Sequence, residues 1–181
     1  MSARPFVEAA VEAGYAVTVI DAFADSQTIA LAEKSVVVGY GRCGFDAAVL
    51  LSEVQKLNLS EFQGCLYGSG FEAQPELLQK IAELVPILGN RAETVGAVKS
   101  GAHFFTELRK LAVSYPDVSM LKPLDSGRFL IKDAGGCGGT HINVVPAEEI
   151  ELSSAEYYQR FIEGLSVSLL FIADGHDITV V

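Results

Sequence analysis

The stretch FLIKDAGGCGGTHI, residues 129–142, is unusually rich in glycine. An apolar run ends at Lys132 and is followed by four glycines in five positions, Gly135, Gly136, Gly138 and Gly139. The stretch is not a P-loop, because no Lys-Ser or Lys-Thr pair follows the glycines. A glycine loop between strands is mobile, and its N–H groups can approach phosphate oxygens without a Cβ in the way. Two interpretations stay open here, a flexible hairpin tip and a phosphate cradle with Lys132 as its cation.

Upstream of this stretch, helical and extended patterns alternate. Apolar residues at helical spacing predict a helix that ends at Gly14, a natural C-cap, and a buried strand follows and ends at Asp21. Further helices are expected over residues 26–34, 45–58 and 74–85, and further strands over residues 35–41 and 64–70. The alternation predicts an α/β lobe with a parallel sheet over residues 1–90. Because the chain opens with a helix, we expect either that the first strand of a doubly wound sheet is absent or that the sequence starts after it.

The pattern changes after residue 90. A helix is expected within residues 93–116, and an extended segment over residues 118–132 contains a Pro, Asp, Ser and Gly turn. Residues 153–164 follow the glycine loop, and the chain closes on two short strands joined by the turn DGHD. We therefore assign residues 91–181 to a second lobe of α+β type, which looks incomplete.

The composition excludes several classes of partner. The formal net charge of -10 argues against a nucleic-acid or anionic-membrane surface, since both need a clustered basic face. No apolar run approaches the roughly 18 to 20 residues that cross a bilayer, and the N-terminus lacks a signal-peptide pattern. We expect a cytoplasmic protein that binds small molecules and is compatible with a homodimer.

Cysteine and histidine spacing gives little support for a metal site. Cys43, Cys65 and Cys137 are odd in number and contain no C-x-x-C pair, so we expect reduced thiols. The three histidines are also too scattered to indicate a metal cluster. We predict no metal ligand within this chain.

A second glycine motif competes with the loop. Gly39, Gly41 and Gly44 satisfy G-x-G-x-x-G between an expected strand and an expected helix, which is the context of a dinucleotide site. The following acidic residue, Glu72, lies farther on than the usual spacing of about 20 residues. An ordinary strand-to-helix turn is therefore the favoured interpretation, with a dinucleotide-dependent oxidoreductase as an alternative.

The segments around the glycine loop resemble the ATP-grasp superfamily. KSGAHFFTELRKLAVSYPDVS upstream, the loop itself, and YYQRFIEG downstream occur in the order and approximate spacing of that family. The resemblance extends to ATP-dependent carboligases related to biotin carboxylase, of the type found among methylotroph C1-metabolism genes. It implies a Rossmann-like pre-ATP-grasp lobe followed by a partial ATP-grasp lobe.

The resemblance implies a nucleotide site. Lys99 and Lys132 match the two family lysines that reach the nucleotide phosphates, and the loop with its four glycines and Thr140 would close over them. YYQRFIEG resembles the segment along which adenine lies. There the Gln159 carbonyl and the Ile162 N–H would contact the base, Phe161 would pack nearby, and Glu163 would bind ribose hydroxyls.

The resemblance also implies a reaction. In this family a carboxylate attacks the γ-phosphate of ATP, and an amine or other nucleophile such as a thiol captures the acyl phosphate. For a small carboxylate substrate, the candidates in the first lobe are Asp21, Ser69 and Glu72, at the expected carboxyl ends of parallel strands. The cofactors implied are ATP and magnesium, with the magnesium ligands expected in a region that these residues lack.

Three hypotheses remain at this stage. The first is an ATP-grasp ligase, represented here by a fragment. The second is a non-catalytic nucleotide-binding module of the same ancestry, and the third is the oxidoreductase that uses the Gly39–Gly44 motif.

Overall fold

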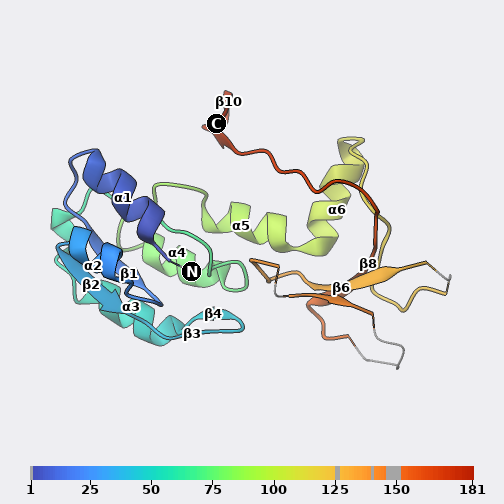
Figure 1. Cartoon of the computed structure of the whole chain (residues 1–181), viewed down its shortest axis with the longest axis horizontal. Coiled ribbons are helices and arrows are strands. Elements are labelled where there is room, and N and C mark those ends of the chain that lie inside the picture. Colours follow the sequence, from blue (N-terminus) through green and yellow to red (C-terminus); the bar gives the residue numbers. More distant parts are fainter. Residues whose placement is uncertain (1, 125–126, 140, 146–151) are drawn as a thin grey trace.

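The structure, a computed structural model, describes residues 2–124, 127–139, 141–145 and 152–181. Two groups of elements lie side by side, joined by a pair of helices (Figure 1). The first group contains α1 (Arg4–Glu12), β1 (Thr18–Asp21), α2 (Ser26–Leu31), β2 (Lys34–Val37), β3 (Tyr40–Gly41), β4 (Gly44–Phe45), α3 (Ala47–Gln55), the 3₁₀ turn Leu59–Glu61 and α4 (Pro75–Ala82). The connecting helices are α5 (Ala92–Lys99) and α6 (Gly101–Lys110), and the second group contains β5 (Val118–Ser119), β6 (Phe129–Asp133), β7 (Ile142–Val144) and β8 (Glu156–Arg160).

The expected parallel sheet is present in the first lobe. Strands β1 and β2 pair in parallel, from Thr18 with Lys34 to Asp21 with Val37. The further strand expected over residues 64–70 is wrong, because among the described residues this stretch makes a single parallel bridge, Cys65 with Ile87. The lobe is therefore α/β as predicted, with a shorter sheet than expected.

Side-chain caps fix where two helices of this lobe begin. The Asp25 carboxylate accepts a hydrogen bond of 3.1 Å from the Thr28 N–H at the start of α2. The Asp46 carboxylate accepts one of 3.1 Å from the Val49 N–H at the start of α3. Such side-chain oxygens satisfy backbone donors that have no partner within a helix.

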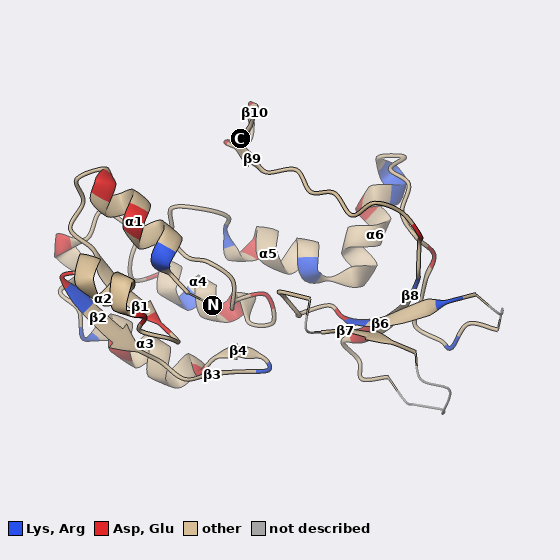
Figure 2. Cartoon of the chain, in the orientation of Figure 1, with Lys and Arg blue, Asp and Glu red and all other residues tan. Residues whose placement is uncertain are grey.

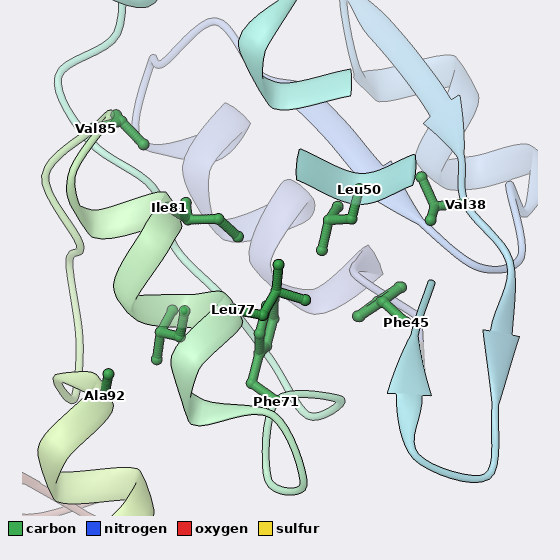
Figure 3. Packing of buried hydrophobic residues seen from close by; sticks show 9 residues of the cluster. Val38, Phe45, Leu50, Phe71, Leu77, Ile81, Val85 and Ala92 are labelled. Atoms are coloured by element: carbon green, nitrogen blue, oxygen red, sulfur yellow. The ribbon is translucent and has the colours of Figure 1, made fainter. Parts of the chain in front are cut away.

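The apolar core lies between α3, α4 and the strand ends of the first lobe (Figure 3). Leu78 is fully buried on α4, and Leu77 and Ile81 lie on the same side of that helix. These spacings of three and four residues place one apolar stripe against the sheet. The buried members are Val38, Phe45, Leu50, Phe71, Leu77, Leu78, Ile81, Val85 and Ala92.

Residues 39–45 differ from the expected strand-to-helix turn. They form a small antiparallel hairpin, in which Tyr40 pairs with Phe45 and Gly41 with Gly44. Gly44 has φ of 111°, and a Cβ there would collide with the Gly70 carbonyl oxygen. The third glycine of the motif therefore serves close backbone packing and the hairpin bend, and α3 begins only at Ala47.

The long helix expected within residues 93–116 is two helices. Ser100 separates α5 from α6 and has φ of -76° and ψ of 103°, which are not helical angles. Its N–H still donates to the Gly96 carbonyl and closes α5. Helical periodicity continues through the break, so the sequence pattern does not reveal it.

The second lobe is built on an antiparallel sheet with strand order β5-β8-β6-β7. Phe129, Ile131 and Tyr158 are buried on one face of this sheet. Residues paired directly across antiparallel strands share a face. Lys132 pairs with Ile142 on β7 and with Tyr157 on β8, so it lies on the opposite face.

The chain ends in the predicted pair of short strands, β9 (Phe171–Ala173) and β10 (Ile178–Val180). Both strands are exposed throughout, and they lie away from both lobes (Figure 1). No described helix is long and apolar enough to cross a membrane.

Candidate functional site

The glycine loop connects β6 and β7, as the sequence predicts. Its backbone turns back on the strand end, because the Asp133 carboxylate accepts a hydrogen bond of 3.0 Å from the Gly135 N–H and the Asp133 carbonyl accepts one of 3.1 Å from the Gly136 N–H. Gly138 and Gly139 have φ of 68° and 81°. Glycine adopts this left-handed region without steric cost. A compact turn therefore holds the first half of the loop, and permissive backbone forms the second half.

Close packing also restricts the residue type in this loop. A Cβ on Gly136 would collide with the His141 ring, and a Cβ on Gly135 would lie 2.8 Å from the Ala73 Cβ. The latter contact reaches across to the first lobe. Neighbouring atoms thus favour glycine at Gly135 and Gly136, whereas the backbone conformation favours it at Gly138 and Gly139.

Lys99 contacts the loop directly. Its Nζ donates a hydrogen bond of 2.9 Å to the Gly136 carbonyl oxygen in a partly buried position. Lys99 is the last residue of α5, so the helix break at Ser100 places the end of this helix beside the loop. The structure therefore brings one predicted lysine and the predicted loop together.

Lys132 approaches the same loop from the strand. It lies on β6, one residue before the strand ends, and burial lowers the pKa of its ammonium group below the ordinary value. Within the described part of the chain, no hydrogen bond or ion pair neutralises this ammonium. A partly desolvated cation without a partner favours an anionic ligand.

The predicted adenine segment follows the same sheet. Gln159 pairs with Leu130 of β6 and with Val118 of β5, so its backbone lies in the interior of the sheet. Phe161 comes just after β8 and packs under the Arg128 guanidinium, 4.3 Å from the ring centroid to Cζ. Ile162 is 60% exposed.

A hollow of about 350 Å³ lies at this end of the sheet. Its wall includes Leu130 and Val144, which pair with each other and share the face that carries Lys132. Phe161 forms a further part of the wall. Glu163 makes an ion pair of 3.2 Å with Arg128 near Phe161, and both side chains are largely exposed. Exposed pairs of this kind contribute about 0–1 kcal/mol, so Glu163 is free to exchange its partner.

A second hollow, of about 340 Å³, lies between the β3–β4 hairpin and the glycine loop. From the hairpin, Tyr40, Arg42 and Cys43 line it. Across from them lie residues of the loop and its strands, including Asp133, Gly135, Gly136, Cys137, His141, Asn143 and Glu156. The two lobes therefore share this cavity.

Two polar contacts cross the cavity. The Tyr40 hydroxyl lies 3.6 Å from Cys137 Sγ, and this hydrogen bond, with burial as a second cause, raises the pKa of Tyr40 to about 12. Arg42 Nη2 lies 3.6 Å from a carboxylate oxygen of Glu156. The sequence did not identify Tyr40 or Arg42 as site residues, because their partners lie in the other lobe.

The three predicted substrate residues occupy different surroundings. Asp21 is buried, and its carboxylate accepts hydrogen bonds from the N–H groups of Phe23 and Ala24, so it stabilises the turn after β1. Glu72 lines the shared cavity and accepts a hydrogen bond of 2.6 Å from the Gly70 N–H. Ser69 is half-buried and lies just outside that lining. Only Glu72 is brought to the loop.

Two further expectations concern Thr140 and metal ligands. Thr140 lies outside the described residues. Within the described ranges, no group of three or more His, Cys, Asp or Glu side chains is arranged to hold a metal ion. Acidic positions are spread over both lobes, and basic positions occur on α5 and around the small sheet (Figure 2).

Comparison with known proteins identifies the second half of the chain. Residues 99–181 match the model of the ATP-grasp domain. This segment belongs to the ATP-grasp superfamily. It begins at Lys99 and includes the glycine loop. A search of curated protein sequences found no match.

Solved structures show the same fold at low sequence identity. The chain is similar to N5-carboxyaminoimidazole ribonucleotide synthetase from Thermotoga maritima, with a TM-score of 0.58 and 18% identity over 87% of this chain. It is also similar to the biotin carboxylase domain of Hydrogenobacter thermophilus 2-oxoglutarate carboxylase, with a TM-score of 0.57 and 15% identity over 78% of this chain. Rhizobium etli pyruvate carboxylase gives a TM-score of 0.62 and 16% identity over 88% of this chain.

The chain spans a minor part of each of these proteins, namely 42%, 34% and 17% of their lengths. The Hydrogenobacter structure is a complex with MgADP, ADP and bicarbonate. The comparisons confirm the predicted fold, a mixed α/β protein with a parallel sheet in a first lobe and a partial ATP-grasp lobe after it.

Proposed function

We propose that this chain binds ATP and forms the phosphate-holding part of an ATP-dependent ligase. The observation that carries the proposal is the Lys99 hydrogen bond to the glycine loop, with Lys132 on the strand that leads into the same loop. Two cations beside a glycine loop suit the transfer of a phosphoryl group, because such catalysis consists mostly of positioning and charge neutralisation.

The described residues fit a nucleotide along one face of the second sheet. Lys132 would contact the phosphates, and Leu130, two residues earlier on the same face, lines the hollow of about 350 Å³ with Val144 and Phe161. Pockets that bind organic ligands are mostly apolar with a few placed polar groups. In this arrangement adenine occupies the hollow, the Ile162 backbone contacts its edge, and Glu163 leaves Arg128 to bind ribose. Gln159 is a weaker candidate, because its backbone pairs with β5 and β6.

Lys99 has a different role from Lys132 in this proposal. It already holds a loop carbonyl, so it orients the loop and adds positive charge to the phosphate site. In the proposed complex the N–H groups of Gly138 and Gly139 cover the phosphates, and those of Gly135 and Gly136 would exchange their Asp133 acceptors for phosphate oxygens. Magnesium would accompany ATP, and no magnesium ligand is assigned within the described residues.

For the reaction, we assign a carboxylate–amine or carboxylate–thiol ligation. A substrate carboxylate oxygen would attack the γ-phosphorus while ADP leaves, and the nucleophile would then displace phosphate from the acyl group. The shared cavity beside the loop, with Glu72 in its wall, is the position for the small substrate. Asp21 and Ser69 remain weaker candidates, because the Asp21 carboxylate is held by backbone N–H groups.

The dinucleotide alternative has less support. The helix after the Gly39–Gly44 motif is capped by the Asp46 carboxylate, which accepts the Val49 N–H. A dinucleotide site needs this helix N-terminus for the pyrophosphate, and a carboxylate at that position repels it.

Equilibrium binding of ATP and of NAD separates these functions. We expect ATP with magnesium to bind more tightly than NAD, and Lys132→Met to weaken ATP binding by about tenfold to a hundredfold, since hydrogen bonds to charged groups contribute roughly 1.5–3 kcal/mol. Lys80→Met is the matched control, because Lys80 is an exposed lysine on α4. Tighter binding of NAD that Lys132→Met leaves unchanged would refute the proposal. Binding of ATP without any turnover on carboxylate substrates would favour the non-catalytic nucleotide-binding module.

A further inference from the structure

Two free cysteines that are far apart in the sequence line the cavity between the lobes. Cys43 belongs to the turn of the β3–β4 hairpin, and Cys137 lies in the middle of the glycine loop. Both are reduced thiols, and Cys43 is exposed. The proposed function uses neither thiol.

Contacts on both sides of the cavity hold the hairpin turn against the loop. The Tyr40 hydroxyl lies 3.6 Å from Cys137 Sγ itself. Arg42, directly before Cys43, makes an ion pair of 3.6 Å with Glu156 at the start of β8. Cys43 therefore lies on a short turn next to two residues, Tyr40 and Arg42, that both contact the second lobe at or beside the glycine loop.

Both cysteines are followed by glycines with positive φ angles. A disulfide needs Cα atoms about 4.4–6.8 Å apart. Gly138 and Gly139 follow Cys137 with positive φ angles, and Gly44 follows Cys43 with φ of 111°. Each cysteine thus sits beside glycine, where small changes of backbone angle move a side chain without steric cost.

Cys65 provides a contrast. It makes its contacts within the first lobe, at the bridge to Ile87, and burial raises the pKa of its thiol. A raised pKa lowers the fraction of thiolate, which is the reactive form. Reactivity is thus expected to be confined to the pair in the cavity.

We propose that Cys43 and Cys137 form a reversible disulfide that fixes the glycine loop to the β3–β4 hairpin. The oxidant is a low-molecular-weight disulfide such as oxidised glutathione. The exposed Cys43 thiolate attacks one sulfur and releases one glutathione thiol, and the Cys137 thiolate then attacks the mixed disulfide and releases the second. Two protein thiols are oxidised, one disulfide is reduced to two thiols, and an added thiol reverses both steps.

The expected consequence rests on the proposed function. A loop tied to the hairpin cannot close over phosphates, so oxidation would weaken ATP binding. The cross-link itself is independent of that function and is measured separately.

The test begins with the full chain, oxidised by excess oxidised glutathione and digested with trypsin without reduction. We expect mass spectrometry to find peptide 43–56 linked to peptide 133–160, with the mass of two hydrogen atoms lost and reversal by dithiothreitol. A protein that stays reduced, a glutathione adduct as the main product, or a disulfide between two chains on a non-reducing gel would overturn the inference.

Two cysteine variants test which thiols form the cross-link. Cys65→Ser should retain the cross-link, whereas Cys43→Ser should abolish it. In the wild type, we expect oxidation to weaken ATP binding at least tenfold, and in Cys43→Ser the affinity should be the same with and without oxidant. A cross-linked chain that binds ATP as tightly as the reduced chain would refute the locking role, while a reduced chain without ATP affinity would refute the proposed function and leave the disulfide standing.

Discussion

The Lys99 ammonium group donates a hydrogen bond of 2.9 Å to the Gly136 carbonyl oxygen. This bond fastens the end of α5, which packs against the core of the first lobe through Ala92, to the glycine loop of the second lobe. The geometry of the loop therefore depends on a residue outside the small sheet. The relationship makes Lys99 a positioning group as well as a cation.

Replacing Lys99 tests that double role. We expect Lys99→Met to weaken ATP binding by about tenfold or more, because both a charge-assisted hydrogen bond and a nearby charge are lost. Isothermal titration calorimetry with magnesium and ATP measures the change. Lys56→Met is the control, since Lys56 is an exposed lysine paired with Glu53 on α3. Equal affinity of both variants would contradict the role of Lys99.

The conformation of the glycine loop can be tested by adding a single Cβ atom at position 136. In Gly136→Ala the new Cβ collides with the His141 ring, so the loop must shift and release Lys99. We expect ATP affinity to fall by at least as much as in Lys99→Met, with little change in far-ultraviolet circular dichroism. Gly164→Ala is the matched control, because a Cβ there meets no atom within 4 Å. A Gly136→Ala chain that binds ATP normally would show that the loop does not need this conformation.

The packing of α4 in the core of the first lobe can be tested through the free energy of unfolding. Leu78→Ala removes a fully buried side chain on α4 and should lower the free energy of unfolding by about 2–5 kcal/mol. Leu111→Ala, at a position that is 70% exposed, should change it by no more than about 0.5 kcal/mol. Urea denaturation followed by circular dichroism measures both. Similar losses in the two variants would mean that α4 does not pack as described.

The Asp25 carboxyl should make the free energy of unfolding depend on pH. Hydrogen bonds from the Thr28 hydroxyl and N–H lower the pKa of the Asp25 carboxyl to about 2. Because the folded pKa lies below the unfolded value of about 3.9, the carboxylate stabilises the fold above that pH, and this stabilisation is lost as the pH falls toward 2. Asp25→Asn keeps a cap oxygen and removes the charge. The difference in unfolding free energy between wild type and variant should shrink through this window, and a constant difference would contradict the assignment.

Local patterns in the sequence predicted most of the regular elements. The helix that ends before Gly14, the strand that ends at Asp21 and the extended segments on both sides of the glycine loop are confirmed. Each depends on residues within a few positions of one another, through apolar period, glycine conformation or a cap. The resemblance to ATP-grasp proteins then predicted the family.

The missed features depend on distant residues. The β3–β4 hairpin contains a glycine motif that also fits a strand-to-helix turn, and only Gly70 behind Gly44 and Cys137 beside Tyr40 distinguish the two. Residues 64–70 have strand-like composition, but Ile87 is their only described partner for a bridge. The break at Ser100 has no helix-breaking proline. The assignments of Thr140 and of the boundary near residue 90 stay predictions.

We propose that Lys99, Lys132 and the glycine loop together hold the phosphate groups of ATP. The most direct measurement is calorimetric titration of the chain with adenosine, AMP, ADP and ATP, the last two with magnesium. We predict that affinity rises with each phosphate, and that the rise is lost in the Lys99→Met, Lys132→Met double variant while adenosine binding remains. Equal affinity for adenosine and ATP in the wild type, or an unchanged rise in the double variant, would contradict the claim.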